Sequence, residues 1–285
     1  MGAIGLAAGF AMLVWWFATG IILYLDGLPR STFRWSLLGA TGVLGLALVA
    51  LRQTAIDATT PSSAYVAFLV AIAIWGWLEM SFLMGFITGP RKHACPAACG
   101  GVKHFIHGAE VLIYNELATL AAALLVFFST LNAPNRVAWW TFLVLWTMRL
   151  SAKLNLFFGV PNSGEQFLPA HLQYLRSFFK KRRLNLLFPL SVAGATVADV
   201  LLVQRGLHSD EPFQVTAYAL VATLLALALL EHWFMVLPVP TEKLWAWSSE
   251  KFRGAKPGSR SQALRSGFVR SAGDGAPRIV VKAPT

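Results

Sequence analysis

The sequence predicts an all-α fold, a polytopic membrane bundle of about seven transmembrane helices, with the N-terminus outside and the C-terminus in the cytoplasm. Composition is the first reason, because 56% of the residues are hydrophobic and only 13% are charged. An ordinary soluble domain has roughly 25% charged residues. The second reason is the presence of seven apolar segments near the ~20 residues that cross a bilayer as a helix. The third is the uneven distribution of Lys and Arg among the connections.

The seven predicted spans are mainly apolar runs separated by shorter polar connections. They are Ile4–Leu25, Trp35–Leu51, Ala64–Thr88, Phe105–Thr130, Val137–Phe158, Leu186–Val203 and Phe213–Leu237. The first is longer than the apolar region of a signal peptide and lacks a basic region before it, so we expect it to be retained. The second and sixth are the shortest, and we expect them to tilt little or to be partly re-entrant.

The basic residues set the predicted orientation. With seven spans, 19 of the 24 Lys and Arg residues lie on one side, in the connections 26–34, 89–104 and 159–185 and in the C-terminal tail. Cytoplasmic connections carry the excess of Lys and Arg in membrane proteins. An even number of spans would move the tail to the other side and weaken this asymmetry, so the count of basic residues also favours an odd number.

Two regions follow from this pattern: a transmembrane helical domain, residues 1–240, and a basic cytoplasmic tail, residues 241–285. We expect the tail to begin at the membrane interface, with Trp245 and Phe252 as anchors. Beyond Gly254 it is rich in Gly, Ser, Ala, Pro and Arg, a composition typical of disorder.

A second interfacial segment is predicted in the connection between the fifth and sixth spans, EQFLPAHLQYLRSFFKKRR. Its apolar residues recur at helical spacing and precede a block of cations; they are Leu168, Leu172, Leu175 and Phe179, followed by Lys180, Lys181, Arg182 and Arg183. This pattern favours a helix lying on an anionic membrane surface.

Ionisable residues within the spans are the main candidates for function, because a charge in hydrocarbon is costly. The cluster consists of Glu79, Glu110, Glu116, Arg149, Lys153, Glu231 and His232. Arg149 and Lys153 are four residues apart and share one helical face. We interpret the cluster as internal ion pairing. A carboxylate and histidine metal site and a proton or ion pathway are the alternatives, although no Glu-x-x-His spacing is present.

The connection KHACPAACGGVKHFIH contains four residues that could ligate a metal or a pigment: Cys95, Cys99, His104 and His107. Thiolate and imidazole together suit zinc, and one neutral imidazole suffices as an axial ligand to a haem or chlorin. A plain loop is the simpler interpretation, because the Cys-x-x-x-Cys spacing is loose. On the cytoplasmic side the cysteines are expected to be reduced.

Several function classes are disfavoured. The basic residues lie in connections and the tail rather than on one face of a soluble fold, so no nucleic acid is expected as a partner. No Walker loop, nucleophile elbow or dinucleotide fingerprint stands in the right context. No internal repeat indicates a transporter built from two halves.

Several sequence blocks resemble the photosynthetic complex assembly family of the PuhE type from purple bacteria. These blocks are WWFATGIILYLD, WGWLEMSFLMGFITGPRK, LIYNELATL, WTFLVLWTMRLSAKLNLFFGVPN, FLPAHLQYLRSFFKKRRLNLLFPLSV and LEHWFMVLPVP. The resemblance covers about residues 10–240. It implies a multi-pass protein of the inner or intracytoplasmic membrane that takes part in building the reaction centre and core antenna or in supplying bacteriochlorophyll. It brings no catalytic residue set.

The resulting hypothesis is an assembly factor without catalytic turnover. Its expected partners are reaction-centre and core antenna subunits, other assembly factors and membrane lipids, with bacteriochlorophyll or a metal as a transient ligand and no established cofactor. The first alternative is a membrane enzyme with a carboxylate and histidine metal site acting on a tetrapyrrole or lipid. The second is a transporter of ions or precursors.

Overall fold

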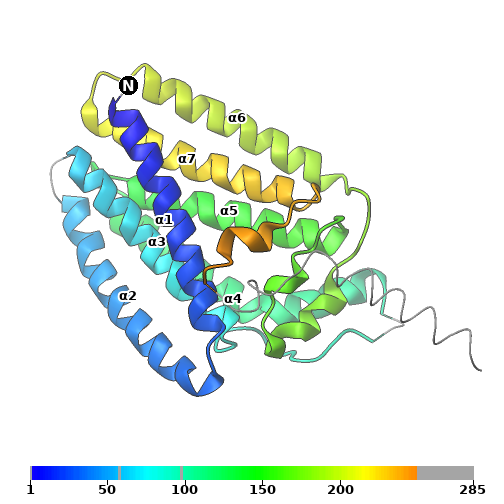
Figure 1. The fold of residues 1–285 in the computed structure, drawn as a ribbon. Helices are drawn as coiled ribbons and strands as arrows, with labels where there is room; N and C mark the ends of the chain where they lie inside the picture. Colours follow the sequence, from blue (N-terminus) through cyan, green and yellow to red (C-terminus); the bar gives the residue numbers. More distant parts are fainter. Residues whose placement is uncertain (1, 57–58, 97–98, 249–285) are drawn as a thin grey trace, which may run out of the picture.

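The structure is a computed structural model that describes residues 2–56, 59–96 and 99–248. Within these ranges the chain is helical and has no strand, which confirms the all-α prediction (Figure 1). The long helices are α1 (Gly2–Asp26), α2 (Phe33–Ile56), α3 (Pro61–Leu83), α4 (Gly101–Thr130), α5 (Val137–Phe158), α6 (Leu187–Leu207) and α7 (Pro212–Phe234). Short 3-10 helices occupy the connections: η1 (Arg30–Thr32), η2 (Glu165–Phe167), η3 (Ala170–Phe178) and η4 (Thr241–Trp245).

Six of the long helices in the described chain are apolar enough to cross a membrane, namely all except α5. The chain is therefore a multi-pass membrane protein. Helix α5 has 22 residues and packs against α3, α4, α6 and α7, but Arg149 and Lys153 lower its hydropathy. The fifth predicted span is thus a helix packed among four others, whose charges face neighbouring helices. The orientation across the membrane stays a prediction.

Local chemistry sets the ends of α3. The Thr60 side chain accepts a hydrogen bond from the Ser63 backbone N–H, and the Ser63 hydroxyl in turn accepts from the Thr60 N–H, with Pro61 in the first turn. This capping box starts the helix before the predicted Ala64. At the other end, Gly85 has a φ of +82°, a conformation that favours glycine. The helix therefore ends at Leu83 rather than at the predicted Thr88.

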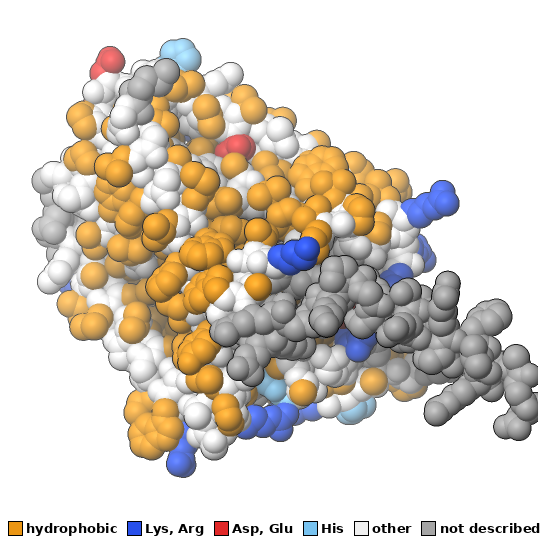
Figure 2. Space-filling model, viewed as in Figure 1, with side chains coloured by type: hydrophobic (Ala, Val, Ile, Leu, Met, Phe, Trp, Pro, Cys, Tyr) orange, Lys and Arg blue, Asp and Glu red, His pale blue; other side chains and the backbone are white. Residues whose placement is uncertain are grey.

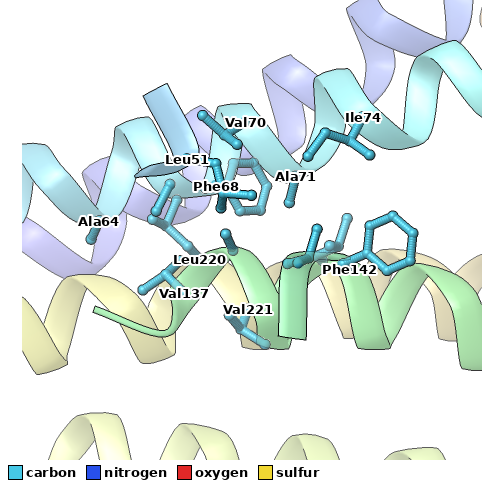
Figure 3. Close-up of a cluster of buried hydrophobic side chains, with 14 of the residues drawn as sticks. Leu51, Ala64, Phe68, Val70, Ala71, Ile74, Val137, Phe142, Leu220 and Val221 are labelled. Carbon is cyan, nitrogen blue, oxygen red and sulfur yellow. The ribbon is translucent and has the colours of Figure 1, made fainter. Parts of the chain in front are cut away.

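The main core lies where α3 meets α5 and α7 (Figure 3). Phe68 from α3, Phe142 from α5 and Leu220 from α7 are completely buried. The alanines Ala64 and Ala71 of α3 are buried beside them. Small residues let the helix backbones approach closely, which is how helices associate where lipid supplies no hydrophobic drive.

The segment after α5 corrects one sequence prediction. Leu172, Leu175 and Phe178 are buried and pack with Phe82 of α3 and Val111 of α4. In a 3-10 helix residues three apart lie on one side, so η3 presents these side chains to the protein. The apolar face that was predicted to lie on the lipid surface is covered by the bundle instead.

The start of the tail behaves similarly. Trp245, predicted as a membrane anchor, is 5% exposed and packs against Trp15 and Phe167. Its Nε1 donates a hydrogen bond to the Trp16 carbonyl. Trp245 therefore anchors η4 to α1 rather than to lipid. The predicted anchor Phe252 and the stretch predicted to be disordered lie outside the described residues.

The outer surface is mostly apolar. Figure 2 shows hydrophobic side chains spread over the face that carries α1 and α6, with several Lys and Arg side chains toward one end. Exposed apolar residues include Leu6 and Leu13 of α1, Leu46 of α2 and Leu190 of α6. Such a surface suits contact with lipid or with other membrane helices.

Candidate functional site

Arg149 of α5 forms a two-point ion pair with Glu79 of α3. Its Nε lies 3.1 Å from Glu79 Oε1 and its Nη2 lies 2.6 Å from Oε2. The Glu79 side chain is 14% exposed and that of Arg149 is 40% exposed. A forked guanidinium–carboxylate contact fixes orientation as well as distance, so this pair sets how α5 lies on α3.

Lys153, one turn later on α5, pairs with a different helix. Its Nζ lies 2.7 Å from Glu116 Oε1 of α4 and 5.6 Å from the centre of the Phe82 ring. The two cations share one face of α5, and the structure divides them between α3 and α4. Each cation of α5 therefore meets a carboxylate.

The neighbouring acid and imidazole of α7 point to different partners. Glu231 Oε1 accepts a hydrogen bond from Trp15 Nε1 of α1 at 2.9 Å. His232 is 1% exposed, with Nδ1 2.9 Å from the Ala228 carbonyl and Nε2 2.9 Å from Ser151 Oγ. Because a carbonyl can only accept, Nδ1 carries the proton and Nε2 accepts from the Ser151 hydroxyl.

Sequence reasoning missed a polar network on the opposite side of α5. Asn155 is fully buried, and its Nδ2 donates to the Ser151 carbonyl at 2.9 Å and lies 3.4 Å from Ser191 Oγ of α6. Successive helical residues turn by about 100°, so Ser151 and Asn155 lie across the helix from Arg149 and Lys153. Ser151 and Asn155 are four residues apart in the sequence, as Arg149 and Lys153 are, and this spacing could have revealed the second polar strip.

A mainly apolar groove of about 480 Å³ opens between α5, α6 and α7 beside this network. Its lining includes Trp140, Met148, Ser151, Ala195 and Leu225. An apolar groove on a membrane bundle suits a hydrocarbon chain, with the serine hydroxyl at hand for one polar group.

Glu110 does not join the other acids. It lies 3.4 Å from Arg91 in the connection before α4, and its side chain is 42% exposed. Glu79, Glu110, Glu116 and Glu231 thus serve four separate partners, and their carboxylates are not arranged around one metal position. In the described part of the chain, the group with three ligand atoms close together is instead Cys95, Cys99 and His107.

That cysteine and histidine group lies where the connection 84–100 meets the start of α4. His107 Nδ1 is 3.2 Å from Cys99 Sγ and 3.7 Å from Cys95 Sγ, while His104 Nδ1 is 3.3 Å from Cys95 Sγ. Both cysteines are free thiols. Partial burial raises the pKa of the Cys95 thiol, and the adjacent Cys99 thiol raises it further.

The connection between α5 and α6 contains a second missed residue, Glu165. It accepts hydrogen bonds from Ser163 Oγ at 2.8 Å and Arg176 Nε at 2.8 Å, and Lys181 Nζ lies 3.0 Å away. Burial alone would raise the pKa of Glu165, but these three donors outweigh it and lower the pKa to about 2. Lys181, predicted to bind the membrane surface, is therefore engaged within the protein.

The rest of that basic block lies beside the same connection. Lys180 Nζ is 5.0 Å from the centre of the Phe157 ring, and the stem of Arg182 packs on Gly159. Arg182 and Arg183 are exposed. A membrane-surface role for Lys180, Arg182 and Arg183 stays a prediction.

Comparison with known proteins gives two matches. The family model described as "Protein of unknown function (DUF3623)" matches residues 1–255. A protein of Rhodobacter capsulatus described as "Uncharacterized 30.4 kDa protein in puhA 5'region" is 38% identical over 246 residues, which cover 85% of this chain and 89% of that protein. No solved structure matches the chain.

Proposed function

The chain belongs to the DUF3623 family, and we propose that it is a membrane factor for assembly of the photosynthetic apparatus. It binds helices of reaction-centre or core antenna subunits, or bacteriochlorophyll on its way to them, in the inner or intracytoplasmic membrane of a purple bacterium. The Rhodobacter capsulatus relative is described as lying in the puhA 5' region, which supports a link to photosynthesis. The sequence blocks that resemble the PuhE type support the assembly role.

One structural observation carries the proposal: two outer helices present open rows of glycine. On α2, Gly39, Gly42 and Gly45 are exposed, and a Cβ added at any of them would meet no other atom within 4 Å. Gly5 and Gly9 of α1 have the same open surroundings. Glycines four apart, as Gly5 and Gly9 are, let two membrane helices approach closely, and small residues at a helix interface act in the same way. The rows are therefore suited to receive helices of another membrane protein.

The interior of the bundle supports the same proposal. Arg149 pairs with Glu79 and Lys153 pairs with Glu116, so these charges are neutralised between α3, α4 and α5 and none of them lies on α1 or α2. A factor that docks on other helices needs this division between a self-neutralised interior and an apolar exterior. The groove beside α5 and α6 is the place where a pigment tail would bind.

The test is complementation in a phototrophic host whose own gene has been deleted. We expect the deletion to lower the yield of reaction centre and core antenna, and the wild-type chain to restore it. The double variant Gly39→Leu/Gly42→Leu is expected to fail to restore the yield at normal protein level, because two large side chains separate the docking helices. Gly194→Leu on α6, also open and exposed, is the matched control.

Tagged protein from the same cells identifies the occupant. Co-purification of photosynthetic subunits that is lost in Gly39→Leu/Gly42→Leu and kept in Gly194→Leu supports subunit binding. Bacteriochlorophyll absorbance that is lost in Ala195→Trp supports pigment binding in the groove. A deletion strain with normal reaction-centre and antenna yield would contradict the proposal.

A further inference from the structure

Four side chains of types that can ligate a metal gather at the start of α4. Cys95 and Cys99 come from the preceding connection, and His104 and His107 lie one turn apart on the helix. The ligand atoms of Cys95, Cys99 and His107 all lie within 4.8 Å of one another. His104 Nδ1 adjoins this group at 3.3 Å from Cys95 Sγ.

We infer that Cys95, Cys99 and His107, with His104 as the fourth ligand, bind one zinc ion. In a tetrahedral site with Zn–S near 2.3 Å and Zn–N near 2.0 Å, sulfur and nitrogen ligands lie about 3.6 Å apart. His107 Nδ1 lies 3.2 Å from Cys99 Sγ and 3.7 Å from Cys95 Sγ, so Cys95, Cys99 and His107 already stand at nearly the separations that zinc requires. His104 Nδ1 lies 3.3 Å from Cys95 Sγ but outside the group of three, so its ring has to shift toward the ion to complete the site.

The chemistry of the donor set selects the metal. Thiolate and imidazole ligands favour zinc over Mg²⁺ and Ca²⁺, which prefer oxygen. On binding, the Cys95 and Cys99 thiols each release one proton to water, and their two thiolates balance the charge of Zn²⁺. No electron is transferred. With four protein ligands the coordination sphere is closed, which is typical of a structural site rather than a catalytic one.

The surroundings hold the ligands in place. The Cys95 backbone N–H donates to Ser177 Oγ of η3 at 2.9 Å, and the His104 ring stacks between Phe157 and Phe178. His104 is 6% exposed, and its Nε2 has no hydrogen-bond partner in the described chain. Its Nδ1 faces the Cys95 thiol, and the ring also interacts with the Phe178 backbone.

Zinc here joins three parts of the same end of the bundle. The ligands come from the connection before α4 and from α4 itself, and Ser177 and Phe178 tie them to η3. The same connection carries Arg91, which pairs with Glu110. The ion would fix the start of α4 against η3. This role is structural and requires no reaction with a small molecule.

The experiment uses the full chain, purified in detergent without chelator, and measures metal by mass spectrometry. We expect about one zinc per chain. Replacement by Co²⁺ is expected to give a thiolate-to-cobalt charge-transfer band and the intense visible bands of a tetrahedral ion. Cys95→Ser, Cys99→Ser and His107→Ala are expected to lower affinity at least about 10-fold. His104→Ala is expected to abolish the tetrahedral spectrum.

The matched control is His93→Ala, because His93 lies in the same connection and is exposed. It is expected to keep zinc and the cobalt spectrum. A second measurement on the wild type avoids variants that fail to fold: two thiols should become reactive to a maleimide only after a strong chelator removes the ion.

Less than about a tenth of an equivalent of zinc, both as purified and after incubation with zinc, would overturn the site. Equal loss in His93→Ala and His107→Ala would overturn the ligand assignment. An unchanged cobalt spectrum in His104→Ala would overturn the fourth ligand. A Cys95–Cys99 disulfide in freshly purified protein, or a haem or chlorin spectrum lost with His107→Ala, would also contradict zinc binding.

Discussion

The chain has ion pairs in two regions. In one region the surroundings are apolar, and in the other the charged groups lie next to water. Inside the bundle, Arg149 meets one acid, Glu79, whose side chain is only 14% exposed, so water has little room to replace the guanidinium at that carboxylate. In the connection between α5 and α6, Glu165 collects several donors, among them Arg176 and Lys181, whose side chains are 53% and 67% exposed. The first region has single partners in an apolar medium, and the second has several partners next to water.

The difference teaches what each region depends on. Removing one member of a buried pair leaves a charge without compensation, which costs about 3–5 kcal/mol. An exposed pair contributes about 0–1 kcal/mol, because water replaces the lost partner. The bundle should therefore be sensitive to single substitutions that the connection tolerates. Four substitutions, ordered by expected effect, test this contrast.

Arg149→Met should have the largest effect. Glu79, 14% exposed, would lose its forked partner in an apolar setting, and we expect about 3 kcal/mol less stability. Thermal unfolding of the purified protein in detergent, together with its level in the membrane, measures this loss. Arg205→Met on α6, an exposed arginine of a spanning helix, is the control.

The double variant Glu79→Gln/Arg149→Met removes both charges and should recover most of the stability. If Arg149→Met were as stable as Arg205→Met, the interior pair would not differ from a surface charge, and the contrast between the regions would fail.

Lys153→Met should cost somewhat less, about 2 kcal/mol. The side chain of its partner Glu116 is 28% exposed. The carboxylate left without a cation would therefore be less completely enclosed than that of Glu79. The measurement is a double-mutant cycle with Glu116→Gln, scored by unfolding midpoint. If the changes caused by the two single substitutions add up to the change caused by the double substitution, the two side chains do not interact.

The sequence predicted the helices well because a bilayer imposes a length and a composition that single residues reveal. Every predicted span corresponds to an α-helix. The observed helix ends differ from the predicted ones by a few residues where capping residues set the boundary, as Pro61 does at the start of α3 and Gly85 does after its end. The interpretation as internal ion pairing turned the charged face of α5 toward other helices, but the sequence did not show which helices surround α5, because neighbour relations depend on contacts between distant segments.

The candidate site was predicted in part. Arg149 and Lys153 stand out as charges in an apolar run, but the choice of Glu79 for one and Glu116 for the other depends on how three helices rotate about their axes. The four-residue spacing of Ser151 and Asn155 could have predicted that they share one helical face. Glu165 could not be predicted, because an acidic residue in a polar connection does not differ from its neighbours in polarity.

Glu165→Gln should have a modest effect that depends on pH. In the folded chain the pKa of Glu165 is lowered from 4.5 to about 2. Its ionised form therefore stabilises the fold fully above pH 4.5, and this contribution is lost as the pH falls toward 2. We expect about 1 kcal/mol less stability at pH 7, and a smaller difference from wild type at pH 3 than at pH 7. Unfolding midpoints across that range measure it, and a difference from wild type that does not change with pH would contradict the assignment.

Glu110→Gln should have the smallest effect, and it sharpens the contrast most directly. Its pair with Arg91 is long at 3.4 Å and open on the Glu110 side, which is 42% exposed, so we expect about 0.5 kcal/mol. Salt screens exposed charges over about 3 Å at 1 M but acts little on buried ones. The effect of Glu110→Gln should therefore disappear in 1 M salt, whereas that of Arg149→Met should persist. If both losses vanished together in salt, the Arg149 pair would be in contact with water, and α5 would line an aqueous path instead of a dry interior.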